Sequence, residues 1–279
     1  MFPMFQQISI RILIAGFACT MALGGCSAPG DSKEAIPGPT SAGDGEPGID
    51  VGLGQMALRV GTSQTAPPIV FEKDGQIVGI EADLARRLAA ALGRKLEFVP
   101  LYWPNLIPEL RGRRIDIIMA GMSVTRERAR KVAFTDPYLT VGQRALIRED
   151  DLATLGTKQA ILSTTARVGL EKGSTGEQFS RETLTGPTKI SLPTLALATE
   201  SLIDGKVDVV IHDSPSIQWL AQKHRADGLV AVPGTFTTET LAWAVHPDDA
   251  QLLEAANRVL SELKESGELK AIISQWLSE

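Results

Sequence analysis

The sequence is poor in cysteine, in aromatic side chains and in long apolar stretches. Only two of its 279 residues are cysteine, too few for a disulfide scaffold. No stretch approaches the roughly 18 apolar residues that a membrane-spanning helix needs. The formal charge is −5, whereas a protein that binds nucleic-acid phosphates is normally basic. We therefore expect no nucleic-acid partner. We also expect no metal site, since the three histidines show no metal-ligand spacing.

The sequence has instead the composition of a folded, globular protein. Hydrophobic residues make up 43% of it and charged residues 22%, although aromatic residues contribute only 5%. The apolar residues are spread along the chain, which excludes wholesale disorder. A chain of this length can form one large domain or two lobes, each with its own core.

The N-terminus has the pattern of an export signal. Arg11 precedes a run of 12 largely apolar residues at positions 12–23, which is too short to span a bilayer. The run ends in Leu23-Gly24-Gly25-Cys26, which resembles the lipobox of bacterial lipoproteins. This resemblance implies that residues 1–25 are a signal peptide and that Cys26 carries lipid. The alternative is a buried N-terminal helix with an incidental cysteine.

A segment rich in glycine and proline follows the predicted lipidation site. Eleven of the 29 residues at positions 27–55 are glycine or proline, and the segment shows no apolar periodicity. We expect residues 26–56 to form a flexible tether with a reach on the order of 30 Å. A lipid anchor with such a tether predicts an extracytoplasmic protein that works beside a membrane surface. We also expect the protein to be a monomer.

Strand and helix patterns alternate through the rest of the chain. Residues 58–61, 96–99 and 115–120 have the pattern of strands, and the last of them is the nearly continuous apolar run of a parallel strand covered on both faces. Residues 80–92 carry leucine at helical spacing. The alternation predicts an α/β fold of open, mostly parallel sheets flanked by helices.

A short internal repeat indicates two similar lobes. Residues 112–118 (GRRIDII) resemble residues 205–210 (GKVDVV), and a polar turn follows each segment. Open parallel sheets bind ligands beyond the carboxyl ends of their strands. This rule selects two turns as parts of a binding site, Gly121–Thr125 and His212–Pro215.

Two residues of opposite charge lie at these turns. Arg128 falls in the first turn of a helix that Thr125 can cap, where the helix dipole disfavours a cation. Asp213 directly follows an apolar strand. A solvated helix face for Arg128 and a helix-capping carboxylate for Asp213 are the simpler interpretations. Together, however, the two side chains complement the carboxylate and the ammonium group of a free amino acid.

Several motifs in a consistent order resemble one protein family. From Leu58 to Leu277 the chain is similar to the family 3 extracellular solute-binding proteins, the polar-amino-acid receptors of ABC importers. The matching segments are 79–84 (GIEADL), 103–110 (WPNLIPEL), 120–128 (AGMSVTRER), 134–138 (FTDPY), 173–177 (GSTGE) and 212–215 (HDSP). The resemblance implies a receptor that delivers an amino acid to an ABC permease in the membrane, with no cofactor and no catalysis.

The same resemblance implies how the chain is divided. The family has a two-lobed fold, the type II periplasmic-binding-protein fold. Residues 57–145 and 242–279 would form lobe 1, and residues 146–241 would form lobe 2. Two crossings, near Gln143–Arg148 and Thr237–His246, would act as hinges. Closure of the lobes on the ligand would then desolvate both charge pairs.

The ligand's backbone groups are assigned to five residues by the resemblance. Arg128 would hold the carboxylate, helped by Ser123 and by the backbone amide of Thr175. Asp213 would hold the ammonium group, to which the carbonyl of Gly121 would also accept a hydrogen bond. These assignments predict one charged anchor on each lobe.

The ligand's side chain is assigned less narrowly. Trp103 would stack on it, unless this residue is a core tryptophan, and His212 would touch it. Ser63 is a predicted ligand-binding position at which many relatives have an acidic residue, and Ala66 stands where many have an aromatic one. The missing acid weakens the case for a cationic ligand such as arginine.

An enzyme on the same fold is the main alternative. Cyclohexadienyl and arogenate dehydratases belong to this family, and the segment 103–106 (WPNL) resembles theirs. They are thought to use a glutamate in the cleft as general acid, and Glu177 lies in a comparable place, as a glutamate also does in plain binding proteins. The predicted lipid anchor favours delivery to a permease over catalysis.

Overall fold

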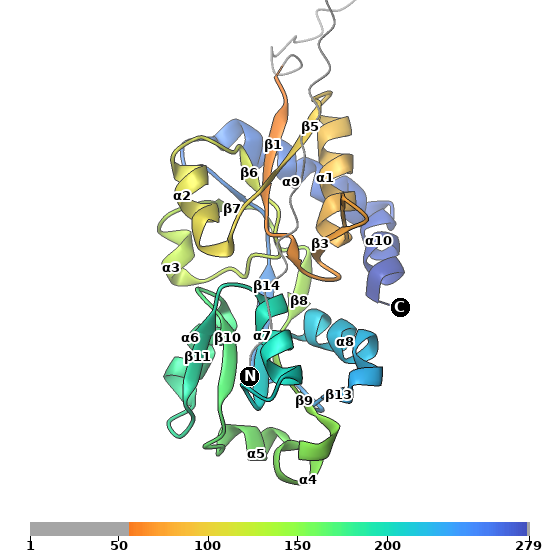
Figure 1. Cartoon of the computed structure of the whole chain (residues 1–279). Coiled ribbons are helices and arrows are strands. Elements are labelled where there is room, and N and C mark those ends of the chain that lie inside the picture. Colours follow the sequence, from red (N-terminus) through yellow and green to blue (C-terminus); the bar gives the residue numbers. More distant parts are fainter. Residues whose placement is uncertain (1–55, 278–279) are drawn as a thin grey trace, which may run out of the picture. The chain divides into compact units, whose positions relative to one another are not determined.

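The computed structural model describes residues 56–277, which form two lobes, each built on a five-stranded sheet (Figure 1). The predicted signal peptide, Cys26 and all but the last residue of the predicted tether lie outside the described residues. Within residues 56–277, no helix is both long enough and apolar enough to cross a bilayer.

The first sheet has four strands that run in one direction and one that runs against them. Its strands are Leu58–Thr62 (β1), Leu96–Pro100 (β5), Ile117–Ile118 (β6), Ala133–Phe134 (β7) and Ala244–Val245 (β15). Their order is β5-β1-β6-β15-β7, and β15 pairs antiparallel with both of its neighbours. Since β15 comes from the last part of the chain, the chain returns to lobe 1 after it has built lobe 2.

The second sheet repeats this arrangement. Its strands are Gln143–Arg148 (β9), Val168–Glu171 (β10), Lys189–Leu192 (β11), Val209–Asp213 (β12) and Leu229–Ala231 (β13). Their order is β11-β10-β12-β9-β13, and here β9 is the strand that runs against its neighbours. The strands of the short sequence repeat, β6 and β12, therefore hold corresponding positions in the two sheets.

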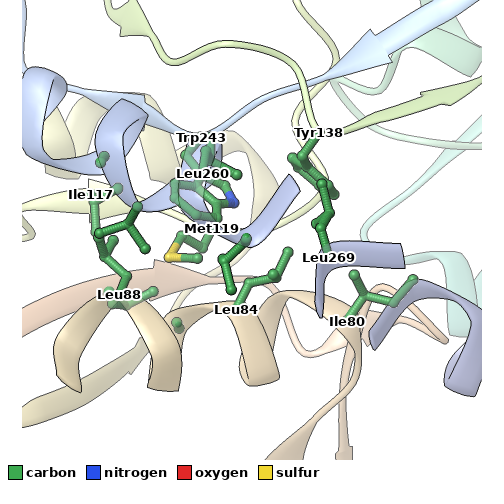
Figure 2. Packing of buried hydrophobic residues seen from close by; sticks show 14 of the residues in the cluster. Ile80, Leu84, Leu88, Ile117, Met119, Tyr138, Trp243, Leu260 and Leu269 are labelled. Atoms are coloured by element: carbon green, nitrogen blue, oxygen red, sulfur yellow. The ribbon is translucent and has the colours of Figure 1, made fainter. Parts of the chain in front are cut away.

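Helices cover both faces of the first sheet, because neighbouring residues of its strands point to opposite sides. Ile117 packs in a core with the helices Ile80–Ala91 (α1), Ala250–Glu265 (α9) and Glu268–Leu277 (α10). Figure 2 shows Leu84 and Leu88 of α1 in this core with Met119 and Trp243. Ile118 points the other way and packs with the helix Leu106–Arg111 (α2).

The second sheet is covered in the same manner. The helices of lobe 2 are Leu152–Leu155 (α4), Lys158–Leu162 (α5), Thr175–Thr183 (α6), Leu195–Ile203 (α7) and Ser214–Lys223 (α8). Ile211 packs in the core that α4, α5 and α6 cover, whereas its neighbour Val210 packs under α7 and α8. Packing on both faces fixes the carboxyl ends of these strands in place.

Short elements complete the described chain. They are the small sheet of Thr65–Ala66 (β2), Val70–Lys73 (β3) and Gln76–Val78 (β4), the helix Arg126–Ala129 (α3), and the 3₁₀ turns Trp103–Asn105, Glu149–Asp151 and Arg225–Asp227.

The chain passes between the two sheets along a pair of antiparallel strands. These are Leu139–Val141 (β8) and Glu239–Leu241 (β14). The segment Gln143–Arg148, predicted as the first crossing, is instead strand β9 inside the second sheet, so this crossing comes earlier in the chain. Gly142 separates β8 from β9 and lies so close to the other segment that a Cβ there would be 2.1 Å from the Thr237 carbonyl oxygen. A side chain at this position would push the two crossing segments apart.

Candidate functional site

A pocket lies beyond the carboxyl ends of strands from both sheets. Its water-accessible volume is about 20 Å³, roughly room for one water molecule, so the two lobes lie close together around it. Seven of the eight predicted ligand-binding residues line it, namely Trp103, Gly121, Ser123, Arg128, Thr175, His212 and Asp213. Ser63, the eighth, is buried but is not part of the lining. Glu171, Ser174 and Ser216 also line the pocket, and the sequence analysis did not select them.

Arg128 is a buried cation that forms no ion pair with a carboxylate within residues 56–277. Thr125 caps α3 by accepting a hydrogen bond from the Arg128 amide (3.2 Å). The residue is only 9% exposed, which excludes a solvated helix face. Nη1 donates to the carbonyl of Ser123 (2.9 Å) and Nη2 donates to the carbonyl of Gly173 in lobe 2 (3.2 Å). Burial lowers the pKa of Arg128, but a guanidinium remains charged at any physiological pH. A buried charge without a counter-ion favours the binding of an anion.

Trp103 connects Arg128 to the second lobe. The Arg128 guanidinium lies 5.0 Å from the centre of the Trp103 ring, within the range of a cation–π interaction. Its Nε1 donates to the carbonyl of Gly173 (2.9 Å), the group that also accepts from Arg128. The residue packs at the edge of the apolar cluster under α2 and is not fully buried. Stacking on a ligand stays a prediction, since these contacts serve the arginine and the lobe contact.

The turn at Gly121, which follows β6, is hydrogen-bonded to the buried carboxyl group of Glu81. Gly121 has a φ of 70°, and a Cβ there would lie 2.8 Å from Ile69. Its amide donates to Glu81 Oε1 (2.9 Å), and the hydroxyl of Tyr138 donates to the same oxygen (2.7 Å). Burial raises the pKa of Glu81 to about 7, although both hydrogen bonds oppose this change. Glu81 therefore fixes the Gly121 turn while it carries a proton for much of the time at neutral pH.

The raised pKa of Glu81 makes the stability of the protein depend on pH. The folded state binds this proton more tightly than the unfolded state, whose carboxyl pKa is about 4.3. The stabilising contribution is therefore complete below pH ~4.3 and is lost as pH rises through about 7. We expect the free energy of unfolding, measured with urea, to fall between pH 4.5 and pH 8. The fall should be up to about 3 kcal/mol larger in the wild type than in Glu81→Gln. The control Glu72→Gln, a change of an exposed residue, should show the same pH dependence as the wild type. If the free energy of unfolding changed equally with pH in the wild type and in Glu81→Gln, the expectation would be wrong.

Asp213 supplies the anion on the second lobe. It ends β12, is 8% exposed, and makes no side-chain capping bond to α8, which excludes the helix-capping interpretation. Its Oδ1 accepts a hydrogen bond from Gln143 Nε2 (2.6 Å). Burial raises the pKa of Asp213, and the charge of Glu239 raises it further, against His212, Gln143 and Arg128. An ammonium group beside Asp213 would relieve this cost.

Glu171 and His212 form a second polar pair in lobe 2. Glu171 ends β10, which is the parallel neighbour of β12, so the two side chains meet at adjacent strand ends. Glu171 Oε2 lies 3.0 Å from His212 Nε2, and both residues are buried, at 3% and 6% exposed. Burial lowers the pKa of His212, but its bond to Glu171 and the charges of Asp213, Glu171 and Glu239 raise it overall. The strand-end rule could have found Glu171, had β10 been recognised.

Thr175 and Ser123 face each other from the two lobes. Thr175 is the first residue of α6, which Ser174 caps by accepting from the amide of Glu177 (3.1 Å). First-turn amides have no partner inside their helix and can bind an anion. The hydroxyl oxygens of Ser123 and Thr175 lie 3.5 Å apart. Both polar groups are therefore placed beside the space that the guanidinium of Arg128 faces.

Glu177 lies in a wider outer cleft and not in the pocket lining. Its Oε2 accepts from the amide of Gly173 (2.8 Å), and its Oε1 bonds to Arg181 (2.8 Å) and to the hydroxyl of Ser191. Burial raises the pKa of Glu177, but these bonds and the charge of Arg181 lower it overall. An ionised, ion-paired carboxylate is a poor general acid.

The ionisable groups of the pocket are one cation on lobe 1 and a mostly acidic set on lobe 2. Arg128 comes from lobe 1, while Glu171, His212 and Asp213 come from lobe 2. The described part of the chain contains no cluster of three or more His, Cys, Asp or Glu side chains that could hold a metal ion. This arrangement suits a small molecule with a carboxylate at one end and a cationic nitrogen at the other.

Comparison with curated proteins points to amino-acid receptors and to one enzyme. The chain is 30% identical over 229 residues to ABC transporter arginine-binding protein 1 of Escherichia coli, which covers 80% of this chain and 91% of that protein. It is 27% identical over 270 residues to the cyclohexadienyl dehydratase of Pseudomonas aeruginosa, with coverage of 96% and 95%.

Comparison with solved structures and with a family model also points to solute-binding proteins. An amino acid ABC transporter substrate-binding protein from Streptococcus pneumoniae, bound to L-arginine, superposes with a TM-score of 0.74 at 29% identity, covering 80% of this chain and 94% of that one. The model of the bacterial extracellular solute-binding proteins, family 3, matches residues 58–279. The chain therefore belongs to family 3 of the bacterial extracellular solute-binding proteins.

Proposed function

We propose that this protein is a lipid-anchored receptor that captures a free amino acid between its lobes and delivers it to an ABC permease. The observation that carries the proposal is the buried guanidinium of Arg128. Within residues 56–277 it has two carbonyl partners and no carboxylate partner, and it lines a pocket that Asp213 also lines. An α-amino acid supplies the missing carboxylate and an ammonium group for Asp213. The curated relatives named as amino-acid-binding proteins support this assignment.

The lobe contacts suggest how binding is coupled to closure. Arg128 and Trp103 of lobe 1 both donate to the carbonyl of Gly173 in lobe 2. An amino acid on Arg128 lies next to this contact, so closure would bury the ligand's charges and strengthen each pair. The crossings at β8 and β14 are the segments about which the lobes would turn. Cys26 and the tether would keep the closed receptor near the membrane and its permease.

A screen for stabilising ligands tests the receptor proposal. We expect thermal unfolding of the purified protein to shift upward with one or a few of the twenty amino acids, because a ligand at 100 times its Kd adds about 2.7 kcal/mol. Isothermal titration calorimetry then gives the Kd and a stoichiometry of one. If no amino acid shifts the unfolding temperature or gives binding heat, the proposal is wrong.

A dehydratase is the second candidate, and one observation favours it. The P. aeruginosa cyclohexadienyl dehydratase matches 96% of this chain, more than the arginine-binding relative does. Against catalysis stands the state of Glu177, which is ionised, ion-paired and outside the pocket lining. Incubation with prephenate or arogenate separates the two functions. Formation of phenylpyruvate or phenylalanine would establish the enzyme, and its absence together with amino-acid binding would support the receptor.

A further inference from the structure

The pocket holds more acid than the backbone of an amino acid can neutralise. On the proposed function, the ligand carboxylate pairs with Arg128 and the ligand ammonium with Asp213. Glu171 then remains in the lining, accompanied only by His212. Besides Glu171, the ionisable groups whose charges act on His212 are Asp213 and Glu239, and both are acidic. When the imidazole is neutral, one negative charge in the pocket is left without a partner, whereas a protonated His212 balances Glu171.

When His212 is neutral, the pair also has hydrogen-bond acceptors that no donor fills. An ionised Glu171 can only accept, so His212 Nε2 must donate across the 3.0 Å contact. Nδ1 of a neutral His212 then bears a lone pair, and it is buried without a partner among the described residues. Glu171 Oε1 has only a long contact, 3.5 Å, with the hydroxyl of Thr65. The hydroxyl oxygen of Ser216, another lining residue, is buried without a partner as well.

The pair is bordered by small residues. Ala66 and Ser216, which also line the pocket, are small residues, and Ser63 is outside the lining. Many relatives have an acidic residue at position 63 in lobe 1, where this chain has serine. In this chain an acidic residue, Glu171, lines the pocket from lobe 2 instead. A side chain that extends to Glu171 meets acceptors and a net negative charge.

We propose that Glu171, positioned by His212, selects amino acids whose side chain ends in a cationic, N–H-rich group, a guanidinium or an ammonium. Such a group donates to the free lone pairs of the pair and supplies the missing positive charge. This inference rests on the proposed receptor function and adds the substrate class to it. It also assigns His212 a positioning role, since its Nε2–H holds Glu171 while Nδ1 stays available as an acceptor.

Arginine and citrulline separate this selection from the receptor function. Citrulline has the same length and nearly the same shape as arginine, but its side chain is neutral. By isothermal titration calorimetry at pH 8, we expect the wild type to bind L-arginine at least ~10-fold more tightly than L-citrulline. Lysine should exceed norleucine in the same way. A charged hydrogen bond in a buried site corresponds to about a 10- to 150-fold effect.

The variant Glu171→Gln should abolish this preference. It keeps the size of the side chain but removes its charge, so arginine affinity should fall by about 10- to 150-fold while citrulline affinity changes less than about 3-fold. Glu200→Gln, an exposed change on the same lobe, is the matched control and should bind like the wild type. Circular dichroism establishes that each variant is folded. If Glu171→Gln does not fold, the comparison of arginine with citrulline in the wild type still decides the matter.

The possible results distinguish the two proposals. Tight binding of a neutral amino acid, with arginine and lysine no better than citrulline and norleucine, would overturn the selection by Glu171 and leave the receptor intact. An equal loss of arginine and citrulline in Glu171→Gln would reduce Glu171 to a structural role and overturn the inference as well. Failure of every amino acid to bind would remove both proposals.

Discussion

Replacement of Arg128 by alanine should raise the Kd for the amino acid by about 30- to 5,000-fold. The change leaves the ligand carboxylate buried without its counter-charge, and loss of one partner of a buried, hydrogen-bonded charge pair costs about 2–5 kcal/mol. A receptor with micromolar affinity, about −8 kcal/mol, would then bind too weakly to be useful. Calorimetry with the amino acid found by the thermal screen measures the effect directly.

The neighbouring arginine provides the control for this experiment. Arg126 lies on the same short helix, carries the same charge, and is exposed. Arg126→Ala should therefore change the Kd by less than about 2-fold, since an exposed charge contributes little in salt. Near-normal affinity in Arg128→Ala would show that the ligand carboxylate is held elsewhere, and the receptor site would have to be reassigned.

Asp213→Asn should have an effect of similar size at the other end of the ligand. The asparagine keeps the shape and one acceptor oxygen near Gln143, but it offers no charge to the ammonium group, so we expect a loss of about 2–5 kcal/mol. Asp204→Asn, an exposed change in the same lobe, should be neutral. Arg128→Ala should weaken binding of the ligand's carboxylate, whereas Asp213→Asn should weaken binding of its ammonium group.

A ligand analogue without the α-amino group isolates the Asp213 interaction. The wild type should bind the desamino analogue much more weakly than the amino acid, because Asp213 then remains buried without a cation. In Asp213→Asn, the two compounds should bind with nearly equal affinity. This double comparison measures the coupling between Asp213 and the ammonium group. Equal discrimination in wild type and variant would place the ammonium site at another residue.

The sequence was informative wherever a simple rule applies to a single position. Alternating strands and helices predicted the α/β fold, and the strand-end rule placed Gly121 and Asp213 beside one pocket. Arg128 stood out because a cation in the first turn of a helix is locally unfavourable. Each of these signals can be read without knowledge of which segments meet in space.

The residues that the sequence analysis missed act through contacts between distant segments. Glu81 supports Gly121, which lies 40 positions later, and Gln143 reaches Asp213, which lies 70 positions later. Strand β10 has only four residues, too few to show a periodicity that would have identified Glu171 as its end. The first crossing was placed too late because residues 139–148 have the pattern of one extended run, whereas the structure divides them at Gly142 into β8 and β9.

The double use of Arg128 has a consequence for how this protein can evolve. A guanidinium has five N–H donors, and the carbonyl groups of Ser123 and Gly173 use two of its bonds. The remaining donors can bind a ligand carboxylate while Arg128 stays bonded to Gly173 of lobe 2. One side chain can therefore bind the ligand and hold the two lobes together. A lysine in its place would have a single compact charge and three donors, and could not span both partners in a fixed plane. A substitution that changes the affinity for the ligand carboxylate would therefore also change the contact between the lobes. We expect substitutions that change ligand specificity to accumulate around the other end of the ligand.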